Sequence, residues 1–264
     1  MSKVAVVTGG TSGIGRATAL ALRAAGCTVY ELSRRAEGVE GLHHISADVT
    51  DEQVVRGAVA QIMDAEGHID ILVNNAGFGI SGAIEFTETE VAKKLFDVNF
   101  FGMVNMNRAV VPLMRQAGHG RIVNLSSVAA PVPIPFQAYY SATKAAVNAY
   151  TMALANELRP FGITVCAVMP GDIHTGFTAA RKKVAAGDDV YQGRISRSVQ
   201  RMEHDEETGM DPAKAGAYIA SVALREGNRH PLYAIRFDYK FFTFLAKVLP
   251  ARFLNWLIYC LYGK

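Results

Sequence analysis

Tyr140 and Lys144, four residues apart, are the pair of side chains in this sequence best suited to acid–base chemistry. Both lie in segment 138–158, an Ala-rich stretch expected to be helical, so their spacing places them on one face. A free tyrosine has a pKa of about 10 and is a poor base near neutral pH. An ammonium group one helical turn away lowers that pKa. The pair therefore predicts proton transfer to or from an alcohol or carbonyl oxygen.

Ser126 and Ser127 give this interpretation weight, because a Tyr-x-x-x-Lys spacing alone occurs often by chance. The two serines close the apolar segment 121–125, which is expected to be the strand before the helix. A hydroxyl at that strand end can donate a hydrogen bond to the same carbonyl oxygen. The three kinds of side chain together predict a site for carbonyl or alcohol chemistry.

A glycine-rich turn lies between the first apolar segment and the first helical segment, and it reads Thr8-Gly9-Gly10-Thr11-Ser12-Gly13-Ile14-Gly15. Glycines let backbone N–H groups approach an anion, and the helix N-terminus adds partial positive charge. The spacing is Gly-x-x-x-Gly-x-Gly rather than the common Gly-x-Gly-x-x-Gly. The turn predicts a pyrophosphate site; the alternative is a turn that only needs a positive φ.

The end of the second strand bears on the choice between NAD and NADP. NAD sites place an acid about 20 residues after the turn. Twenty residues beyond Gly13 stands Ser33, followed by Arg34 and Arg35, while Glu31 lies earlier, inside the strand. A guanidinium binds a 2′-phosphate that a carboxylate would repel. We therefore predict NADP(H) rather than NAD(H), held by Arg34; the alternative is that one arginine is merely solvated.

Two further strand ends carry small polar residues. Asp48, followed by Val49, can accept a hydrogen bond from an adenine amino group or can cap the helix that starts near Asp51. The run 74–77, Asn-Asn-Ala-Gly, suits close approach of a cofactor, although Asn and Gly also build ordinary turns.

Strand-like and helix-like segments alternate along most of the chain. The expected strands are 4–7, 28–32, 42–47, 69–73, 121–125 and 163–168, and the expected helices are 14–25, 51–66, 89–115 with a break near Gly102, and 138–158. Continuous apolar strands that alternate with helices indicate a parallel sheet covered on both faces. We predict one doubly wound α/β domain of the Rossmann type over residues 1–237, with an apolar helical extension over 238–264.

The composition excludes several other classes of protein. Half of the 264 residues are hydrophobic and 19% are charged, which argues against disorder. A net charge of +3 gives no reason to expect a nucleic-acid partner. Three isolated cysteines argue against a disulfide framework or a metal site, and no signal peptide is expected. These observations predict a cytoplasmic protein, with membrane contact only at its periphery.

Two segments interrupt the alternation. Segment 171–209 is polar and follows a strand end, where open α/β sheets bind ligands, so it is either a solvated loop or a lid. Segment 238–264 is rich in large apolar residues with interleaved Lys and Arg, and Pro250 splits it into two short helices. This extension can pack on its own domain or a sister subunit, lie in a membrane interface, or close over an apolar substrate.

Taken in order, the motifs resemble those of the classical short-chain dehydrogenases/reductases. The matching residues spread over 8–175 and are Thr8-Gly9, Gly13-Ile14-Gly15, Asp48, Asn74-Asn75-Ala76-Gly77, Asn99, Ser127, Tyr140-Ser141-Ala142-Thr143-Lys144 and Pro170-Gly171 with Thr175. Ser127 matches better than Ser126, because it lies 13 residues before Tyr140.

The resemblance implies an enzyme that moves a hydride between NADP(H) and a carbonyl or secondary alcohol. In such an enzyme Tyr140 is the general acid/base and Ser127 polarises the carbonyl. Lys144 lowers the pKa of the tyrosine and binds the nicotinamide ribose, and Asn99 holds a water in a proton relay. The expected cofactor-binding residues are Gly9, Thr11, Ser12, Gly13, Ile14, Gly15, Ser33, Arg34, Asp48, Val49, Asn75, Ala76, Gly77, Tyr140, Lys144, Pro170, Gly171, Ile173 and Thr175.

The C-terminal end departs from the family pattern, because the segment 232–237, expected to be a strand, leads into 238–264 instead of the usual Val-Asp-Gly-Gly-like ending. A homo-oligomer is expected, with a dimer favoured over a tetramer. The apolar ending favours a bulky substrate such as a steroid, retinoid or lipid. Two other interpretations are open: a non-catalytic NADP-binding sensor or scaffold, and epimerase or dehydratase chemistry.

Overall fold

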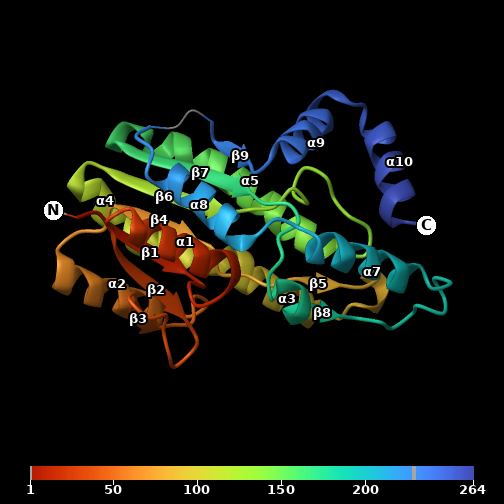
Figure 1. Ribbon diagram of the computed structural model, residues 1–264, viewed down its shortest axis with the longest axis horizontal. Coiled ribbons are helices and arrows are strands. Elements are labelled where there is room, and N and C mark those ends of the chain that lie inside the picture. The colour runs from red at the N-terminus through yellow and green to blue at the C-terminus, as the bar shows by residue number, and fades with distance from the viewer. Residues whose placement is uncertain (1, 228–229) are drawn as a thin grey trace.

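A computed structural model describes residues 2–227 and 230–264 and contains a seven-stranded parallel sheet (Figure 1). The strand order is β3-β2-β1-β4-β6-β7-β9. The strands are β1 (Val4–Thr8), β2 (Thr28–Ser33), β3 (His43–Ser46), β4 (Ile71–Asn74), β6 (Gly120–Leu125), β7 (Ile163–Met169) and β9 (Leu232–Ala234). Helices connect these strands except β2 and β3, which a loop joins, and this arrangement confirms the predicted doubly wound α/β fold.

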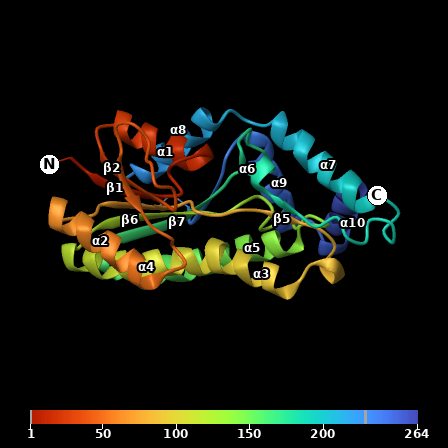
Figure 2. The same ribbon diagram turned by 90° about the horizontal axis from the view of Figure 1, so that it is seen from below.

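Helices cover both faces of the sheet, as Figure 2 shows. One face packs against α2 (Glu52–Glu66), α4 (Gly102–Ala117) and α5 (Ala138–Leu158), and the other packs against α1 (Gly13–Ala24) and α8 (Pro212–Ala223). Alternate residues of each strand point to opposite faces, so in β1 Val4 and Val6 join the first core and Ala5 and Val7 the second. Every residue of β1 is therefore buried, which explains its continuous apolar sequence.

The strand order reverses direction between β1 and β4, and this is where open α/β sheets bind ligands. Hydrogen bonds join the two strand ends across this point. The Thr8 hydroxyl accepts bonds from the backbone N–H groups of Asn75 and Ala76, both at 3.0 Å. The Asn75 amide donates to the Thr8 carbonyl at 2.9 Å. These bonds hold the loops that follow β1 and β4 in a fixed position relative to each other.

The break predicted near Gly102 is a π-helical turn, η2 (Asp97–Phe101), between α3 (Thr89–Phe96) and α4. Its Asn99 side chain is buried and bonds the backbone of Phe78, accepting from the N–H and donating to the carbonyl, both at 3.0 Å. The π-turn therefore anchors the chain that follows β4, since π-turns redirect a side chain without ending a helix.

Segment 171–209 contains α6 (Phe177–Ala180), β8 (Lys182–Lys183) and α7 (Arg194–Glu207), so it is largely ordered into short elements. β8 pairs in parallel with β5 (Ile80–Ser81), which follows the Asn99-anchored chain. This small sheet and α7 form the end of the molecule beyond the carboxyl ends of the main strands (Figure 1).

The last strand is shorter than predicted. β9 ends at Ala234, and α9 (Phe237–Val248) begins at Phe237, where the sequence predicted continued strand. Arg236, at φ +66°, turns the chain between them. Pro250 separates α9 from α10 (Ala251–Tyr262), which confirms the predicted pair of short helices. Among the described residues, no helix has both the length and the apolar character that a membrane span requires.

Candidate active site

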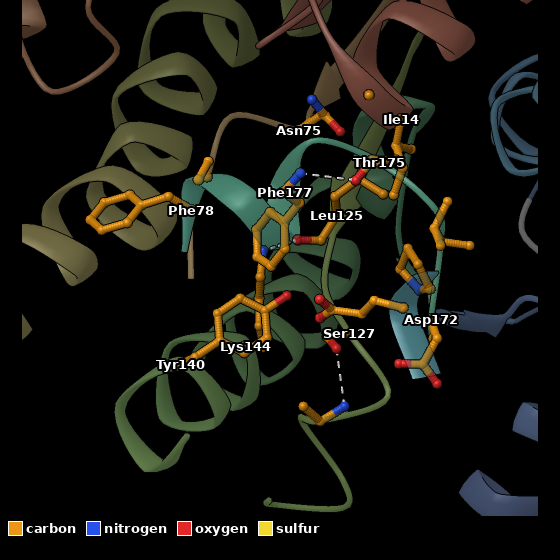
Figure 3. A pocket seen from close by; sticks show the side chains of 18 of the residues that line it. Ile14, Asn75, Phe78, Leu125, Ser127, Tyr140, Lys144, Asp172, Thr175 and Phe177 are labelled. Atoms are coloured by element: carbon orange, nitrogen blue, oxygen red, sulfur yellow. Dashed lines mark hydrogen bonds between the residues drawn. The ribbon is translucent and has the colours of Figure 1, made fainter. Parts of the chain in front are cut away.

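A cavity of about 350 Å³ lies at the carboxyl ends of the central strands and brings most of the predicted site together (Figure 3). The predicted residues that line it are Gly9, Ser12, Gly13, Ile14, Gly15, Asn75, Ala76, Gly77, Ser127, Tyr140, Lys144, Pro170, Gly171, Ile173 and Thr175. The predicted residues that do not line it are Thr11, Ser33, Arg34, Asp48, Val49 and Asn99.

Helix α5 presents Tyr140 and Lys144 to this cavity from one face, as their spacing predicted. The Lys144 ammonium lies 5.7 Å from the centre of the Tyr140 ring. It donates a hydrogen bond of 2.7 Å to the carbonyl of Leu125, the last residue of β6. The ammonium is therefore held between the strand end and the phenol ring.

Burial shifts the pKa values of both groups. It raises the pKa of Tyr140 to about 12, although a hydrogen bond from Ser127 lowers it in part. It also lowers the pKa of Lys144 to about 8. The net shift of the Tyr140 pKa is therefore upward in the protein without ligands, and the expected lowering of that pKa by Lys144 stays a prediction. Loss of hydration disfavours the phenolate by more than its neighbours favour it.

Ser127 and Ser126 have different partners. The Ser127 hydroxyl accepts a bond of 3.1 Å from the backbone N–H of Ala129 and lies beside Tyr140 at the cavity wall. The Ser126 hydroxyl donates to the backbone carbonyl of Lys144 at 3.1 Å and so ties β6 to α5. Ser127 is thus the serine placed to donate to a ligand oxygen, and Ser126 supports the framework.

Asn99 lies behind the cavity wall rather than on it. Besides its bonds to Phe78, its side-chain amide approaches the Thr143 hydroxyl at 3.4 Å. It thereby connects η2 to the helix that carries Tyr140 and Lys144. In this structure its contacts are those of a support, and the predicted water relay stays a prediction.

The glycine turn is shaped by close packing at its two ends. Gly9 and Gly13 have φ values of +66° and +53°, which glycine adopts without strain. A Cβ atom on Gly15 would lie 2.3 Å from both the Gly9 carbonyl and the Asn75 amide. Ser12, the N-cap of α1, makes no side-chain capping bond. The backbone of the first helical turn is therefore open to the cavity, which suits a phosphate group.

The two arginines at the end of β2 have different surroundings. Arg35 lines the cavity, whereas the Arg34 side chain is 75% exposed and lies 4.0 Å from the Asp48 carboxylate. Asp48 accepts bonds from the backbone and hydroxyl of Thr50, and Asp51 is the residue that caps α2. Arg35 is thus the arginine that lines the cavity, and binding of a 2′-phosphate by Arg34 stays a prediction.

Glu31 has no contact with the cavity but holds the chain near Arg35. Its buried carboxylate pairs with His44 of β3 at 2.5 Å, and the other ring nitrogen of His44 lies 3.0 Å from the Arg35 carbonyl oxygen. Burial raises the pKa of Glu31. Glu31 thus helps, through His44, to hold the backbone at Arg35 in place.

The run after β7 forms the opposite wall, and the C-terminal extension packs on it. Tyr239 of α9 lies over Gly171, where a Cβ atom would come within 2.1 Å of its ring. Its hydroxyl donates to the Asp172 carboxylate at 2.6 Å and accepts from the Asp172 N–H at 2.9 Å. The extension therefore fixes the wall that Pro170 and Ile173 line.

Several cavity residues were missed by the sequence reasoning. They are Gln137, Asp172, Phe177, Met202, Glu206 and Tyr262. The Phe177 ring packs 5.9 Å from that of Tyr140, and Tyr262 comes from the last turn of the chain. Asp172 stands inside the Pro170–Thr175 motif and could have been found there. Tyr262 carried no such signal, because its approach depends on how α10 folds back.

Comparison with known proteins adds a family model and a curated relative. The model, described as short chain dehydrogenase, matches residues 3–185. The relative is 3-ketodihydrosphingosine reductase of Bacteroides thetaiotaomicron, which is 41% identical over 227 residues. That alignment covers 85% of this chain and 84% of the relative.

Solved structures agree in fold. A short-chain dehydrogenase from Streptomyces avermitilis matches with a TM-score of 0.84 at 34% identity, covering 97% of this chain and 96% of that one. ElxO with NADP bound matches with a TM-score of 0.76 at 27% identity, and the match covers 91% of this chain and 99% of that one. The 3-ketoacyl-(acyl-carrier-protein) reductase from Brucella melitensis, complexed with NADH, matches with a TM-score of 0.74 at 27% identity. The match covers 88% of this chain and 96% of that one.

Proposed function

Since this chain belongs to the short-chain dehydrogenase family and is an oxidoreductase of the CH–OH/C=O pair with a nicotinamide cofactor, we propose that it is an NADPH-dependent reductase of long apolar carbonyl compounds. The observation that carries the proposal is the meeting of Tyr140, Ser127 and Lys144 with the glycine turn in one cavity. Binding alone would need no acid–base group, so this meeting also argues against a sensor or scaffold.

Tyr140 supplies the proton in this proposal. Its raised pKa keeps the phenol neutral near physiological pH, so it has a proton to give. An alkoxide that forms at the carbonyl is a far stronger base than a phenolate, so the transfer runs downhill. Ser127 donates a hydrogen bond to the same oxygen, and the Lys144 ammonium stabilises the phenolate left behind.

The cofactor fits the first half of the cavity. The uncapped start of α1 and the close-packed Gly9–Gly15 turn suit a pyrophosphate. Pro170, Gly171, Ile173 and Thr175 would flank the nicotinamide, and the arginines after β2 would bind a 2′-phosphate. When bound, NADPH supplies the hydride. Arg35 is the nearer of the two arginines to the cavity, and Arg34 would assist from the rim.

The second half of the cavity supports a bulky apolar substrate. Phe177, Met202 and Tyr262 line the cavity, together with the carboxylates of Asp172 and Glu206. The relative from Bacteroides thetaiotaomicron is named for the reduction of a long-chain ketone, which agrees with this lining.

The outer faces of α9 and α10 support contact with a lipid surface. Phe241, Phe244, Phe253 and Trp256 are exposed there. The exposed basic residues of this segment are Lys240, Lys247, Arg252 and Lys264, against a single acid, Asp238. Aromatic side chains with surrounding cations are typical of helices that lie in an anionic membrane interface. We therefore expect the extension to rest on the membrane that holds the substrate.

Replacement of Tyr140 by Phe tests the function. Y140F removes only the hydroxyl, so the rate of NADPH oxidation with a long-chain ketone should fall at least about a hundredfold. NADPH binding, followed by fluorescence titration, should stay within a few fold. Tyr139→Phe, on the neighbouring residue, is the control and should keep wild-type turnover. A Y140F enzyme within tenfold of wild type would remove Tyr140 from the reaction.

A further inference from the structure

A second cavity, of about 500 Å³, lies between the C-terminal helices and the loop after β6. Its lining is mostly carbon and comes from Pro131 and Pro133 of the loop, Ala246 and Leu249 of α9, and Leu254 and Ile258 of α10. We call it the tail groove. The polar residues of the lining are Arg252 and Asn255, and both are exposed.

Two segments of the chain border both the tail groove and the catalytic cavity. On α10, Ile258 lines the groove and Tyr262 lines the catalytic cavity. A spacing of four places these side chains on one face of the helix. On the other side, Pro133 lines the groove and the next residue, Ile134, lines the catalytic cavity. The same helix face and the same loop therefore border both spaces, which lie next to each other.

Contacts with the main domain hold α10 in this position. The Tyr262 hydroxyl donates to the Asp205 carboxylate of α7 at 3.0 Å. The Arg194 side chain donates to the Gly263 carbonyl at 2.6 Å and lies over the Tyr259 ring at 5.7 Å. Hydrogen bonds and a cation–π contact thus anchor the end of the helix beside the catalytic cavity.

We propose that the tail groove binds the alkyl tail of the carbonyl substrate, whose reacting carbon lies at Tyr140. This inference rests on the proposed function and adds the class of substrate, a linear long-chain ketone. From Leu254 to Tyr262 the wall along α10 spans about 12 Å at 1.5 Å per residue, long enough for several methylene groups. The lining is mostly carbon and its two polar residues, Arg252 and Asn255, are exposed, so a polar or charged tail of the same length should bind less well than an alkyl tail.

The charge around the opening agrees with this occupant. Arg252 and the exposed basic residues of α9 and α10 lie on the same extension as the groove. A lipid that leaves an anionic surface would therefore meet the Lys and Arg side chains of α9 and α10 first and the apolar lining of the groove next. Each methylene transferred from water into the groove should raise kcat/KM about fourfold.

A series of linear ketones from butanone to 2-hexadecanone tests the assignment, with NADPH oxidation as the readout. In the wild type, kcat/KM should rise with chain length until the groove is full. Ala246→Trp fills the groove, so the ratio of kcat/KM for the long ketone to that for the short one should fall at least about tenfold. Ala60→Trp, an exposed change of the same kind on α2, is the control and should keep the ratio within twofold.

Leu254→Ser is the second variant, because it removes apolar surface without adding volume, and it should lower the same ratio. An unchanged ratio in both variants, or a wild-type rate that does not depend on chain length, overturns the tail assignment and leaves the reductase intact. No turnover of any ketone overturns the proposed function itself. A lower ratio that accompanies a change of oligomeric state on size-exclusion chromatography assigns the groove to a second copy of the chain and also overturns the proposal.

Discussion

Replacing Lys144 by Met should make the protein more stable while it abolishes turnover. The Lys144 side chain is 5% exposed, and its ammonium bonds one backbone carbonyl, that of Leu125. No carboxylate of the described residues forms an ion pair with it. Met keeps the unbranched stem and removes the buried charge, which burial penalises.

The size of the effect follows from the pKa of Lys144. The value falls from 10.5 to about 8 on burial. At about 1.4 kcal/mol per pKa unit, the ammonium costs the folded state about 3 kcal/mol. K144M also loses the hydrogen bond to the Leu125 carbonyl, which destabilises the variant by about 1 kcal/mol. The free energy of unfolding of K144M should therefore exceed that of the wild type by about 2 kcal/mol, which raises Tm by about 4–8 °C in a chain of this size.

The extra stability of K144M over the wild type should decrease as pH rises. Because the folded pKa lies below the unfolded one, the penalty is complete below a pH of about 8. It fades as pH rises from about 8 to 10.5, where the unfolded chain also loses the proton. The difference in Tm between K144M and wild type should thus be largest near neutral pH and shrink toward pH 10.5.

Thermal unfolding followed by circular dichroism across this pH range measures the difference, and Lys94→Met, an exposed change on α3, serves as the control. Turnover by K144M with NADPH and a long-chain ketone should be undetectable, because the phenolate of Tyr140 loses its cation. A K144M protein that is less stable than wild type at neutral pH, or a gain that grows with pH, would refute the account of Lys144 as a destabilising group kept for chemistry.

Two further predictions concern the cofactor and the extension. Arg35→Ala should lower the preference for NADPH over NADH, measured as a ratio of kcat/KM, about tenfold or more, and Arg34→Ala should lower it less. A larger effect at Arg34 would return the phosphate to the residue that the sequence favoured. Combined Phe253→Ser and Trp256→Ser should weaken cosedimentation with anionic lipid vesicles about tenfold, whereas Val54→Ser, an exposed change on α2, should not. Equal binding by all three proteins would contradict membrane contact through α10.

Much of the fold was predictable because its signals are local. Apolar runs such as Val4–Val7 and breaks such as Gly67 reflect burial and turn chemistry that depend on near neighbours. Element boundaries were less predictable. The turn at Arg236, for instance, requires a positive φ that no residue type there announces, and it replaced expected strand with helix.

The catalytic positions were also predictable, since helical spacing alone places Tyr140 and Lys144 on one face and strand order brings Ser127 beside them. Their protonation was not. The sequence supplies the charges, but the balance between attraction and lost hydration depends on burial, and burial reversed the expected shift of the Tyr140 pKa.

A doubly wound oxidoreductase with a glycine turn, a catalytic helix and an apolar ending could be predicted from the sequence, because these features follow from periodicity and from the chemistry of neighbouring residues. Tertiary structure decided which arginine lines the cavity, how Glu31 and His44 hold that loop, and that Tyr239 and Tyr262 reach the catalytic walls. Those contacts join residues far apart in the chain, and only the packing of whole elements brings such residues together.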